Sequence, residues 1–320
     1  MADRVSLASS AGRALAATRR GRLNLLTPQD KLLLVAMLGI PTFIHLFLVW
    51  VPTLGSVALS FTRWNGVSAI EPIGLKNYTD IVNIYPPFFP ALSHNVIWLA
   101  FLLLIATPFG MFLAVLLDRD IRGTRFYQSV YFMPVVLSFA IIAFIVDLFF
   151  APEQGLVNNL LGTTKQGNLI DWLGDPKYNL GAALIFTGWR HAGYIMVLYL
   201  AGLKSVDPSL RDAAAVDGAN ARQTFFQVVF PTLQPINIVV LVVTVIEALR
   251  AFDLVFVINK GRNGLELISV LVTNNIIGEA SRIGFGSALA VILLVISLGA
   301  IIPYLVRSFN AEARAEVRGA

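Results

Sequence analysis

Long apolar runs are the feature of this sequence that most constrains its fold. A helix needs about 20 residues to cross about 30 Å of hydrocarbon. Six runs are long enough, and they cover approximately residues 32–61, 96–117, 126–150, 178–203, 236–258 and 285–306. Apolar residues make up 57% of the chain and charged residues 13%, which exceeds what a soluble core needs. The sequence therefore predicts an all-α integral membrane protein with six transmembrane helices.

The connections between these runs differ in their content of Lys and Arg. The side of the predicted membrane that carries both termini has fifteen of these residues, and the opposite side has seven. Because Lys and Arg accumulate in cytoplasmic connections, we expect both termini to be cytoplasmic. The predicted division is a cytoplasmic tail at residues 1–31, a transmembrane domain at 32–308 and a second cytoplasmic tail at 309–320.

The tail at residues 1–31 is rich in Arg, Ser and Ala. It lacks the compact apolar core and the small-residue cleavage site of a secretory signal peptide. We expect a flexible cytoplasmic tail or an interfacial helix, and a transit peptide is the alternative.

A polar, alanine-rich loop at residues 206–235 separates the fourth and fifth predicted spans. Asp207, followed by proline, is a typical helix N-cap. Gly218 predicts a break, and Asn220 can cap a second short helix that reaches Phe230. We therefore expect a helix, a turn and a second helix on the cytoplasmic side.

Small side chains in this loop would let the backbone of another protein approach closely. They are Ala213, Ala214, Ala215, Gly218, Ala219 and Ala221. Charges frame them and could fix the register of a partner, namely Arg211, Asp212, Asp217 and Arg222. The alternative is an amphipathic segment that lies on the membrane surface.

The pattern D-A-A-A-V-D-G-A, followed by Q-x-F-x-x-V-x-x-P, resembles the coupling loop of permeases in ABC importers, which is written EAA-x3-G. Asp212 stands at the glutamate position, Ala213 and Ala214 at the alanines, and Gly218 at the glycine. The resemblance implies a coupling helix that docks in a cleft of an ATPase subunit, with Arg211 and Asp217 beside it. It also identifies the chain as similar to maltose-type permeases, the inner membrane components of binding-protein-dependent transport systems.

Ionisable residues inside two predicted spans are functional candidates because charges at membrane depth are costly. Arg190 and His191 lie near the middle of the fourth span. Glu247, Arg250 and Asp253 follow one another at intervals of three in the fifth span. Two interpretations stay open, which are a shared polar cavity and ion pairs that only reduce the cost of burial.

The segment G-W-x-x-x-x-Y at 188–194 looks like the part of maltose-type permeases that faces sugar. The resemblance implies that the substrate-binding residues are Arg190, His191, Tyr194, Val243 and Glu247, with less support from the motif for Arg250 and Asp253. Guanidinium and carboxylate groups can hold sugar hydroxyls, and aromatic rings can pack on C–H groups. The segment 251–257 also resembles sugar importers, but Gly261-Arg262-Asn263-Gly264 departs from the Gly-Gly-Pro of many relatives.

The sequence lacks the patterns of several common active sites. It has no cysteine, and its three histidines are dispersed without an HExxH pattern. It contains neither a phosphate-binding loop nor a G-x-S-x-G motif. We therefore expect no catalytic residue, metal site or cofactor, and ATP and Mg²⁺ would be bound by partner subunits.

The resemblance implies one permease subunit of a sugar importer in a bacterial or archaeal cell membrane. Its expected partners are a second homologous permease, two cytoplasmic ATPase subunits and an extracytoplasmic binding protein that docks on the outer loops. The alternatives are a glycerol-3-phosphate importer, an ion-coupled secondary transporter and an intramembrane enzyme. The identity of the sugar stays open, as does whether the second permease is a paralogue or another copy.

Overall fold

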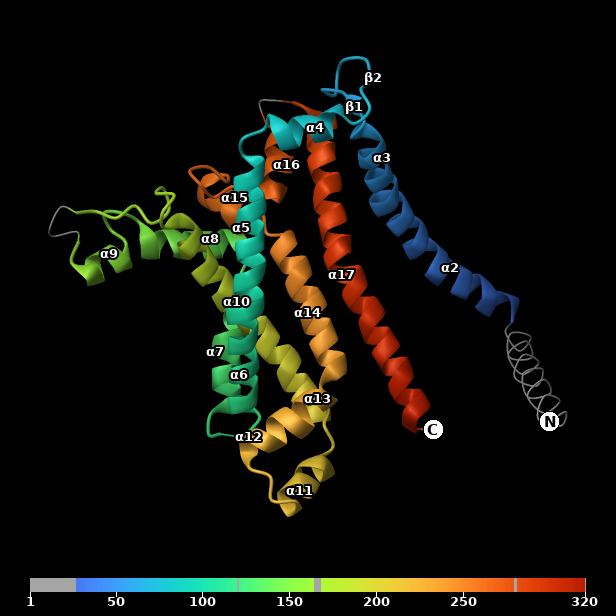
Figure 1. Ribbon diagram of the computed structural model, residues 1–320, viewed down its shortest axis with the longest axis vertical. Coiled ribbons are helices and arrows are strands. Elements are labelled where there is room, and N and C mark those ends of the chain that lie inside the picture. The colour runs from blue at the N-terminus through green and yellow to red at the C-terminus, as the bar shows by residue number, and fades with distance from the viewer. Residues whose placement is uncertain (1–26, 120, 164–167, 279–280, 320) are drawn as a thin grey trace. The chain divides into compact units, whose positions relative to one another are not determined.

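The computed structural model describes residues 27–119, 121–163, 168–278 and 281–319 (Figure 1). The chain forms two units, Met1–Ala58 and Leu59–Ala320. Most of the predicted N-terminal tail lies outside the described residues.

The described part of the first unit is one long helical segment. It comprises α2 (Pro28–His45), the π-helical turn η1 (Leu46–Trp50) and most of α3 (Val51–Leu59). The Thr27 hydroxyl accepts a hydrogen bond from the Asp30 amide, and the Asp30 carboxylate accepts one from the Thr27 amide. This reciprocal cap starts the helix one turn before the apolar run that predicted it.

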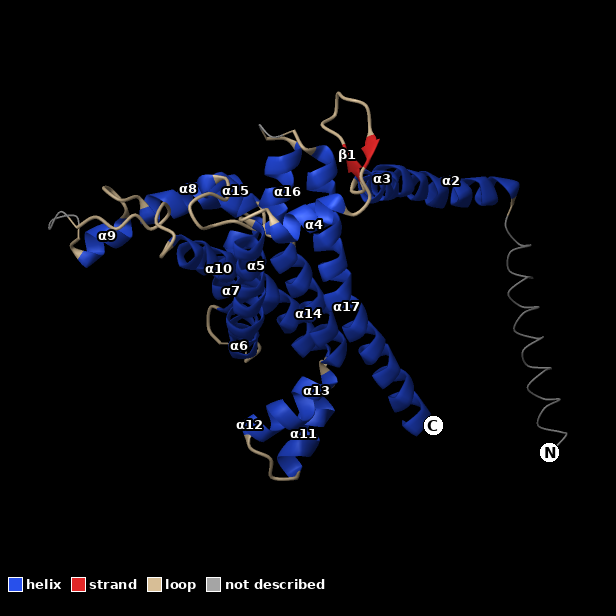
Figure 2. Ribbon diagram, turned by 45° about the horizontal axis from the view of Figure 1, so that its top comes forward, coloured by secondary structure: helices blue, strands red, loops and turns tan. Residues whose placement is uncertain are grey.

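The second unit contains the remaining elements. They are β1 (Thr62–Arg63), β2 (Glu71–Pro72), α4 (Lys76–Asn83), α5 (Phe88–Phe101), η2 (Leu102–Ala106), α6 (Thr107–Leu117), α7 (Thr124–Val136), α8 (Phe139–Phe150), α9 (Leu156–Leu161), α10 (Asn179–Ser205), α11 (Pro208–Val216), α12 (Ala221–Gln223), η3 (Thr224–Val229), α13 (Phe230–Thr232), α14 (Gln234–Leu249), α15 (Asp253–Asn259), α16 (Ile268–Ile276) and α17 (Ile283–Gly319). The strands β1 and β2 form an antiparallel hairpin. In Figures 1 and 2 this hairpin and α4 lie at one end of the unit, and α11–α13 lie at the other.

Each π-helical turn in the described part of the chain ends two residues before a proline. A proline has no amide donor, and its ring crowds the carbonyl of the preceding turn, so one extra residue in that turn relieves the conflict. The residue before the proline then donates to a carbonyl five positions back, as Val51 does to Leu46, Thr107 to Leu102 and Phe230 to Phe225. The helices continue through Pro52, Pro108 and Pro231 without ending.

Two predicted spans are broken helices. The third bends by 102° between α7 and α8. Leu137 is extended there, and the Ser138 hydroxyl caps α8 by accepting from the Ile141 amide. The fifth span ends as α14 at Leu249 and starts again as α15 at Asp253.

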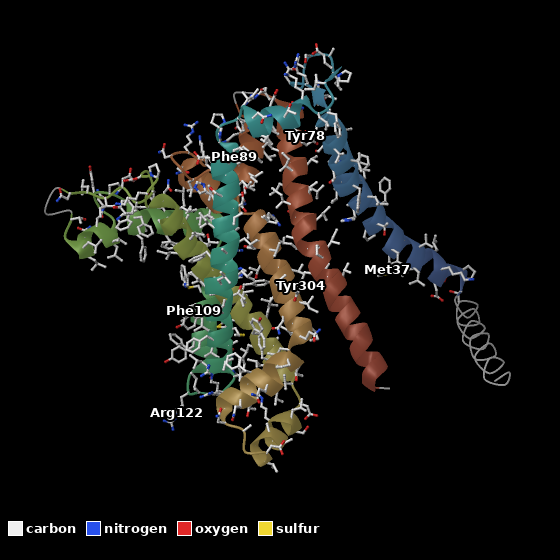
Figure 3. The ribbon with its side chains drawn as sticks, viewed as in Figure 1. Met37, Tyr78, Phe89, Phe109, Arg122 and Tyr304 are labelled. Atoms are coloured by element: carbon white, nitrogen blue, oxygen red, sulfur yellow. The ribbon has the colours of Figure 1, made fainter. Side chains whose placement is uncertain are left out.

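The helix α10 lies at the centre of the second unit and packs against α5, α6, α7, α8, α14 and α15. At Gly110 of α6 an added Cβ would lie 2.6 Å from the carbonyl oxygen of Ala192, so glycine permits the close approach of α6 and α10. Phe89 and Phe109, labelled in Figure 3, are exposed on α5 and α6. Exposed apolar side chains on spans of this length fit contact with lipid.

Among the described residues, three helices are long and apolar enough to cross a membrane, which are Pro28–Leu59, Phe88–Leu117 and Ile283–Val306. The bent pair α7 and α8 makes a fourth if it forms one span. The fourth predicted run is one continuous helix, α10, but it carries Arg190 and His191 in its middle. The fifth is interrupted after the 16 residues of α14. A helical membrane fold is therefore confirmed, whereas six transmembrane helices stay a prediction.

Candidate functional site

A cavity of about 150 Å³ lies beside the break between α14 and α15, and we call it the break cavity. Helices α5, α8 and α10 contribute the rest of its wall. The lining residues are Trp98, Phe139, Thr187, Arg190, Glu247 and the six residues 250–255. Four of the seven predicted substrate-binding residues are therefore brought together here.

Arg190 and Glu247 form an ion pair in this cavity. The distance between Arg190 Nη1 and Glu247 Oε1 is 2.7 Å, and the two side chains are 23% and 38% exposed. The guanidinium also lies over the Phe139 ring, 4.4 Å from its centroid. The two sequence interpretations, ion pairing and cavity lining, thus hold together, because the pair is itself part of the cavity wall.

Arg250 and Asp253 flank the helix break. Neither forms an ion pair with any residue that the structure describes, and both are exposed. The Ser269 hydroxyl donates to the carbonyl of Ala251, which satisfies one backbone group of the break. Arg250 and Asp253 also line a second cavity of about 430 Å³, bounded by α16 and α17. Interrupted helices beside a cavity offer backbone ends and charges to a solute.

His191 lies outside the break cavity, in a buried polar cluster. Its Nε2 is 3.3 Å from the Thr107 hydroxyl and 3.2 Å from the Thr244 hydroxyl. Because the Thr244 hydroxyl already donates to Val240, we assign the imidazole proton to Nε2. Within the described residues, no three His, Cys, Asp or Glu side chains gather closely enough to hold a metal ion.

Tyr194 and Val243 do not line the break cavity either. Tyr194 packs against the core cluster that includes Leu113 and Ile195, and Val243 is half-buried. Four of the predicted substrate-binding residues therefore line the cavity, and the other three, His191, Tyr194 and Val243, lie outside it.

Seven of the residues that line the cavity were not predicted, namely Trp98, Phe139, Thr187, Ala251, Phe252, Leu254 and Val255. Trp98 is the third residue of the predicted span 96–117, at the interfacial depth where tryptophan is usual, so its position carried no signal of a site. Ala251, Phe252, Leu254 and Val255 lie in the segment 251–257 that resembles sugar importers, but they were not assigned to the site. Phe139 and Thr187 are common in packed helices and carried no signal.

The predicted coupling loop has the expected local structure. Asp207 caps α11, and hydrogen bonds from the amide and then the hydroxyl of Ser209 lower the pKa of its carboxyl group. Gly218 follows α11 with a φ of +78°, which glycine adopts readily. Asn220 and Gln223 form a reciprocal cap at the start of α12.

The motif residues of this loop are mostly exposed. Asp212, Ala213, Asp217 and Gly218 are exposed, whereas Ala214 is buried. Arg211 Nη1 lies 2.9 Å from Asp118 Oδ2, and Asp118 is the C-cap of α6 with its side chain 12% exposed. We call this ion pair the α6 tether, since it joins the coupling loop to the end of α6.

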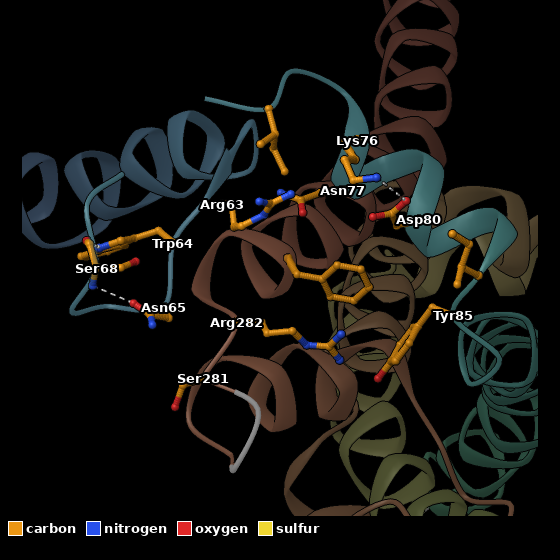
Figure 4. Close-up of a pocket in the computed structure, with 13 residues that line it drawn as sticks. Arg63, Trp64, Asn65, Ser68, Lys76, Asn77, Asp80, Tyr85, Ser281 and Arg282 are labelled. Atoms are coloured by element: carbon orange, nitrogen blue, oxygen red, sulfur yellow. Dashed lines mark hydrogen bonds and ion pairs between the residues drawn. The ribbon is translucent and has the colours of Figure 1, made fainter. Parts of the chain in front are cut away.

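A third cavity, of about 440 Å³, lies at the opposite end of the second unit, and we call it the end pocket (Figure 4). Arg63, Lys76 and Arg282 point toward it, and Asp80 is the one carboxylate among its lining residues. Lys76 lies 3.8 Å from Asp80. Arg282 donates to Asn275 and contacts no carboxylate among the described residues. Arg63 lies 3.3 Å from Glu71. Arg282 is therefore the one cation of the end pocket without a carboxylate partner among the described residues.

Known proteins resemble most of this chain. The xylose/arabinose import permease protein XacH of Haloferax volcanii is 34% identical over 276 residues, which are 83% of this chain and 85% of that protein. The arabinooligosaccharides transport system permease protein AraP of Halalkalibacterium halodurans is 30% identical and covers 80% of this chain and 82% of its own length. A chain in the crystal structure of a bacterial ABC transporter involved in the import of the acidic polysaccharide alginate has a TM-score of 0.75. It is 21% identical and covers 88% of this chain and 96% of its own, so it supports the fold alone.

Residues 106–314 match the family model described as binding-protein-dependent transport system inner membrane component. That range includes the coupling loop, the α6 tether and every lining residue of the break cavity except Trp98. The resemblance predicted from the motif at 212–218 is confirmed, and the chain belongs to the family of inner membrane components of binding-protein-dependent transport systems.

Proposed function

We propose that this chain is one permease subunit of an ATP-driven ABC importer and that its break cavity takes a sugar during translocation. The observation that supports this most is the pairing of Arg190 with Glu247 in the wall of a cavity beside an interrupted helix. Glu247 uses one carboxylate oxygen in that pair, so the second can accept a hydrogen bond from a sugar hydroxyl.

The charge of the break cavity favours a neutral solute over a phosphorylated one. The residues that line it include two cations, Arg190 and Arg250, and two carboxylates, Glu247 and Asp253. A dianionic phosphate would gain little from a wall whose formal charges cancel. Glycerol-3-phosphate is therefore the weaker candidate, and a sugar agrees with the relatives named for xylose, arabinose and arabinooligosaccharides.

The size of the break cavity limits the solute in this conformation. At roughly 30 Å³ per water, about 150 Å³ corresponds to about five water molecules. That volume suits a single sugar ring. A longer saccharide would need space from a second permease subunit or from another conformation.

The coupling loop is the proposed contact with the ATPase. Asp212, Ala213 and Asp217 are exposed, and the two carboxylates form no ion pair with a described residue of this chain. ATP-driven movement of a partner subunit would act on α11 and reach α6 through the α6 tether. We propose that this movement alternates access to the break cavity.

The end pocket is the proposed contact with an extracytoplasmic binding protein. If the coupling loop is cytoplasmic, the opposite end of the second unit faces outward. Arg63 and Lys76 are paired with Glu71 and Asp80, and Arg282 would be left to attract an acidic group of the binding protein and fix its orientation.

Reconstitution tests the proposed function. We expect proteoliposomes that contain both permeases, the ATPase subunits and the binding protein to take up radiolabelled sugar only with ATP. Each component is omitted in turn as a control. Uptake driven by an ion gradient without the ATPase subunits would instead establish a secondary transporter, and turnover of a substrate by the purified chain would establish an enzyme.

Replacement of Glu247 tests the cavity. Glu247→Ala leaves the guanidinium of Arg190 without its carboxylate, whereas Glu247→Gln keeps the shape and one acceptor oxygen. We expect the maximum uptake rate to fall about tenfold in Glu247→Ala and less in Glu247→Gln, with the ATPase still bound. Unchanged uptake in both variants would mean that Glu247 has no role in translocation.

A further inference from the structure

The break cavity contains two hydrogen-bond donors that have no partner. Among the described residues, four buried side-chain nitrogen or oxygen atoms lack a hydrogen bond, and two of them are Trp98 Nε1 and Arg190 Nε. Both residues line the break cavity. Buried polar atoms in folded proteins nearly always have a partner, so each exception needs an explanation.

Trp98 is held firmly in this position. Its side chain is only 1% exposed, and it belongs to a core cluster with Leu102 and Ala248. Asn95, one turn earlier on α5, accepts a hydrogen bond from the Ile268 amide at 3.0 Å and donates to the Ala248 carbonyl at 3.5 Å. These contacts fix the register of α5 against the end of α14, and therefore the place of the indole.

Packing alone does not explain a tryptophan here. A phenylalanine or leucine would fill apolar space without an N–H group, and buried tryptophans usually give that group a partner. Trp64 and Trp172 do so, since Trp64 donates to Ser68 at 3.0 Å and Trp172 donates to Asn158 at 2.8 Å. Trp98 differs from them in that its indole N–H group is buried without a partner, in a residue that lines the break cavity.

We infer that Trp98 Nε1 and Arg190 Nε donate hydrogen bonds to two oxygen atoms of the translocated sugar, and that Trp98 is a specificity-determining residue of the break cavity. This inference rests on the proposed function. Indole and guanidinium N–H groups are donors only, so the solute must present acceptors to them. A sugar presents its ring oxygen or hydroxyl oxygens there, while its own hydroxyl protons face the carboxylates of Glu247 and Asp253.

The test separates the N–H group from the shape of the ring. Trp98→Phe removes the donor, and 3-benzothienylalanine at position 98 replaces the N–H group by sulfur while keeping the bicyclic shape. Trp172→Phe is the matched control, because it removes an indole hydrogen bond outside the cavity. Each variant is reconstituted with its partner subunits at a saturating concentration of sugar-loaded binding protein, and uptake of D-xylose, L-arabinose and maltose is measured.

We expect both changes at position 98 to lower the maximum uptake rate about fivefold, with the ATPase still bound, whereas Trp172→Phe leaves the rate unchanged. Monodeoxy analogues of the best sugar then locate the accepting hydroxyl. The analogue that lacks it should move more slowly in the wild type, and the changes at position 98 should slow it no further. If no hydroxyl accepts the bond, the ring oxygen is the acceptor. A sugar with sulfur in place of its ring oxygen should then move more slowly in the wild type, and the changes at position 98 should slow it no further.

Two results would overturn the inference while the proposed function stands. One is normal uptake in both variants at position 98, which would mean that a water molecule satisfies the indole. The other is an equal reduction for the sugar and for every analogue, which would mean that Trp98 only supports the fold. If the wild-type complex takes up none of the three sugars, the proposed sugar transport fails and this inference fails with it.

Discussion

At the scale of single residues, the cluster of Thr107, His191 and Thr244 joins three helices in the core, and substrate binding by His191 stays a prediction. It joins α6, α10 and α14 through hydroxyl and imidazole groups that are all buried. A buried imidazole that loses its partner keeps the full cost of leaving water. The cluster therefore explains why a polar residue lies at this position in a mostly apolar helix.

Replacement of Thr244 tests this role. We expect Thr244→Val to destabilise the protein by about 1–3 kcal/mol, because the His191 N–H group and the Thr107 hydroxyl lose a partner. Thermal unfolding of the purified chain in detergent measures the change. Thr232→Val is the control, since Thr232 and Thr244 both donate to the carbonyl four residues earlier at 2.7 Å, but Thr232 is exposed. Equal effects of the two changes would contradict a bridging role for Thr244.

The sequence predicted the charged residues of the cavity better than its other residues. Arg190 and Glu247 stood out because an ionised group inside an apolar span is costly unless it has a purpose. His191 was predicted with Arg190, but neighbouring residues of a helix point about 100° apart. Only one of the two faces the break cavity, and which one depends on how α10 is rotated. That rotation is set by tertiary packing.

At the scale of elements, the α6 tether is the connection that the motif did not predict. Asp118 lies at the C-terminal end of α6, where a carboxylate opposes the helix dipole, and Arg211 offsets that charge. The pair has one largely buried partner and joins two segments 93 positions apart in the sequence. It can therefore transmit a movement of α11 to the second predicted span.

A charge exchange tests the α6 tether. We expect Arg211→Asp or Asp118→Arg alone to lower sugar uptake more than ATP hydrolysis, because like charges then meet at this contact. The double variant should recover much of the uptake, with a coupling energy of about 1 kcal/mol in a double-mutant cycle. Arg122→Ala is the control, as it removes an exposed charge four residues after Asp118 that has no described ion pair. Failure of the double variant to recover would remove the tether from the mechanism.

Gly218 is the turn on which the shape of the coupling loop depends. Nothing lies within 4 Å of a Cβ built there, so the cost of Gly218→Ala comes from its φ of +78° alone. We expect a loss of stability of about 1 kcal/mol and weaker binding of the ATPase, measured by thermal unfolding and by co-purification. Gly181→Ala, at an equally open position on α10, should be neutral or stabilising. A normal ATPase complex in Gly218→Ala would show that the turn tolerates other conformations.

Local signals predicted the coupling loop, because helix caps depend on neighbours in sequence. Asp207, Gly218 and Asn220 each have the role that their residue type favours. The bend before α8 was not predicted, although Ser138 is a good cap, since an apolar run on both sides of it also suits one continuous span. Packing of α8 against α15 accompanies the bend, and that contact joins distant parts of the sequence.

At the scale of the whole molecule, the orientation in the membrane is the prediction on which most others depend. The chain has no cysteine, so single cysteines can report it without a background. Val67, in the β-hairpin, is 94% exposed, and Val216, at the end of α11, is 88% exposed. We expect a membrane-impermeant maleimide to label Val67→Cys in whole cells and Val216→Cys only in inverted vesicles.

The two cysteine variants control for one another, since each is reactive from one side only. Labelling of Val216→Cys from outside would place the coupling loop away from any cytoplasmic ATPase and contradict the proposed function. Labelling of both positions from the same side would contradict the end-to-end arrangement of the second unit. Uptake by each unlabelled variant confirms that the complex has assembled.

The gap between α14 and α15 has a consequence for protein engineering. Arg250 and Ala251 are already good helix formers, so Phe252→Leu is the change that favours joining the two helices into one regular helix with all its internal hydrogen bonds. Such a chain should resist heat better than the natural one, because the backbone groups at the break would then have partners within the helix. It should also take up sugar more slowly, because the break cavity would lose part of its wall. Selection for transport would therefore have to preserve the break between α14 and α15, although the break lowers the stability of the protein.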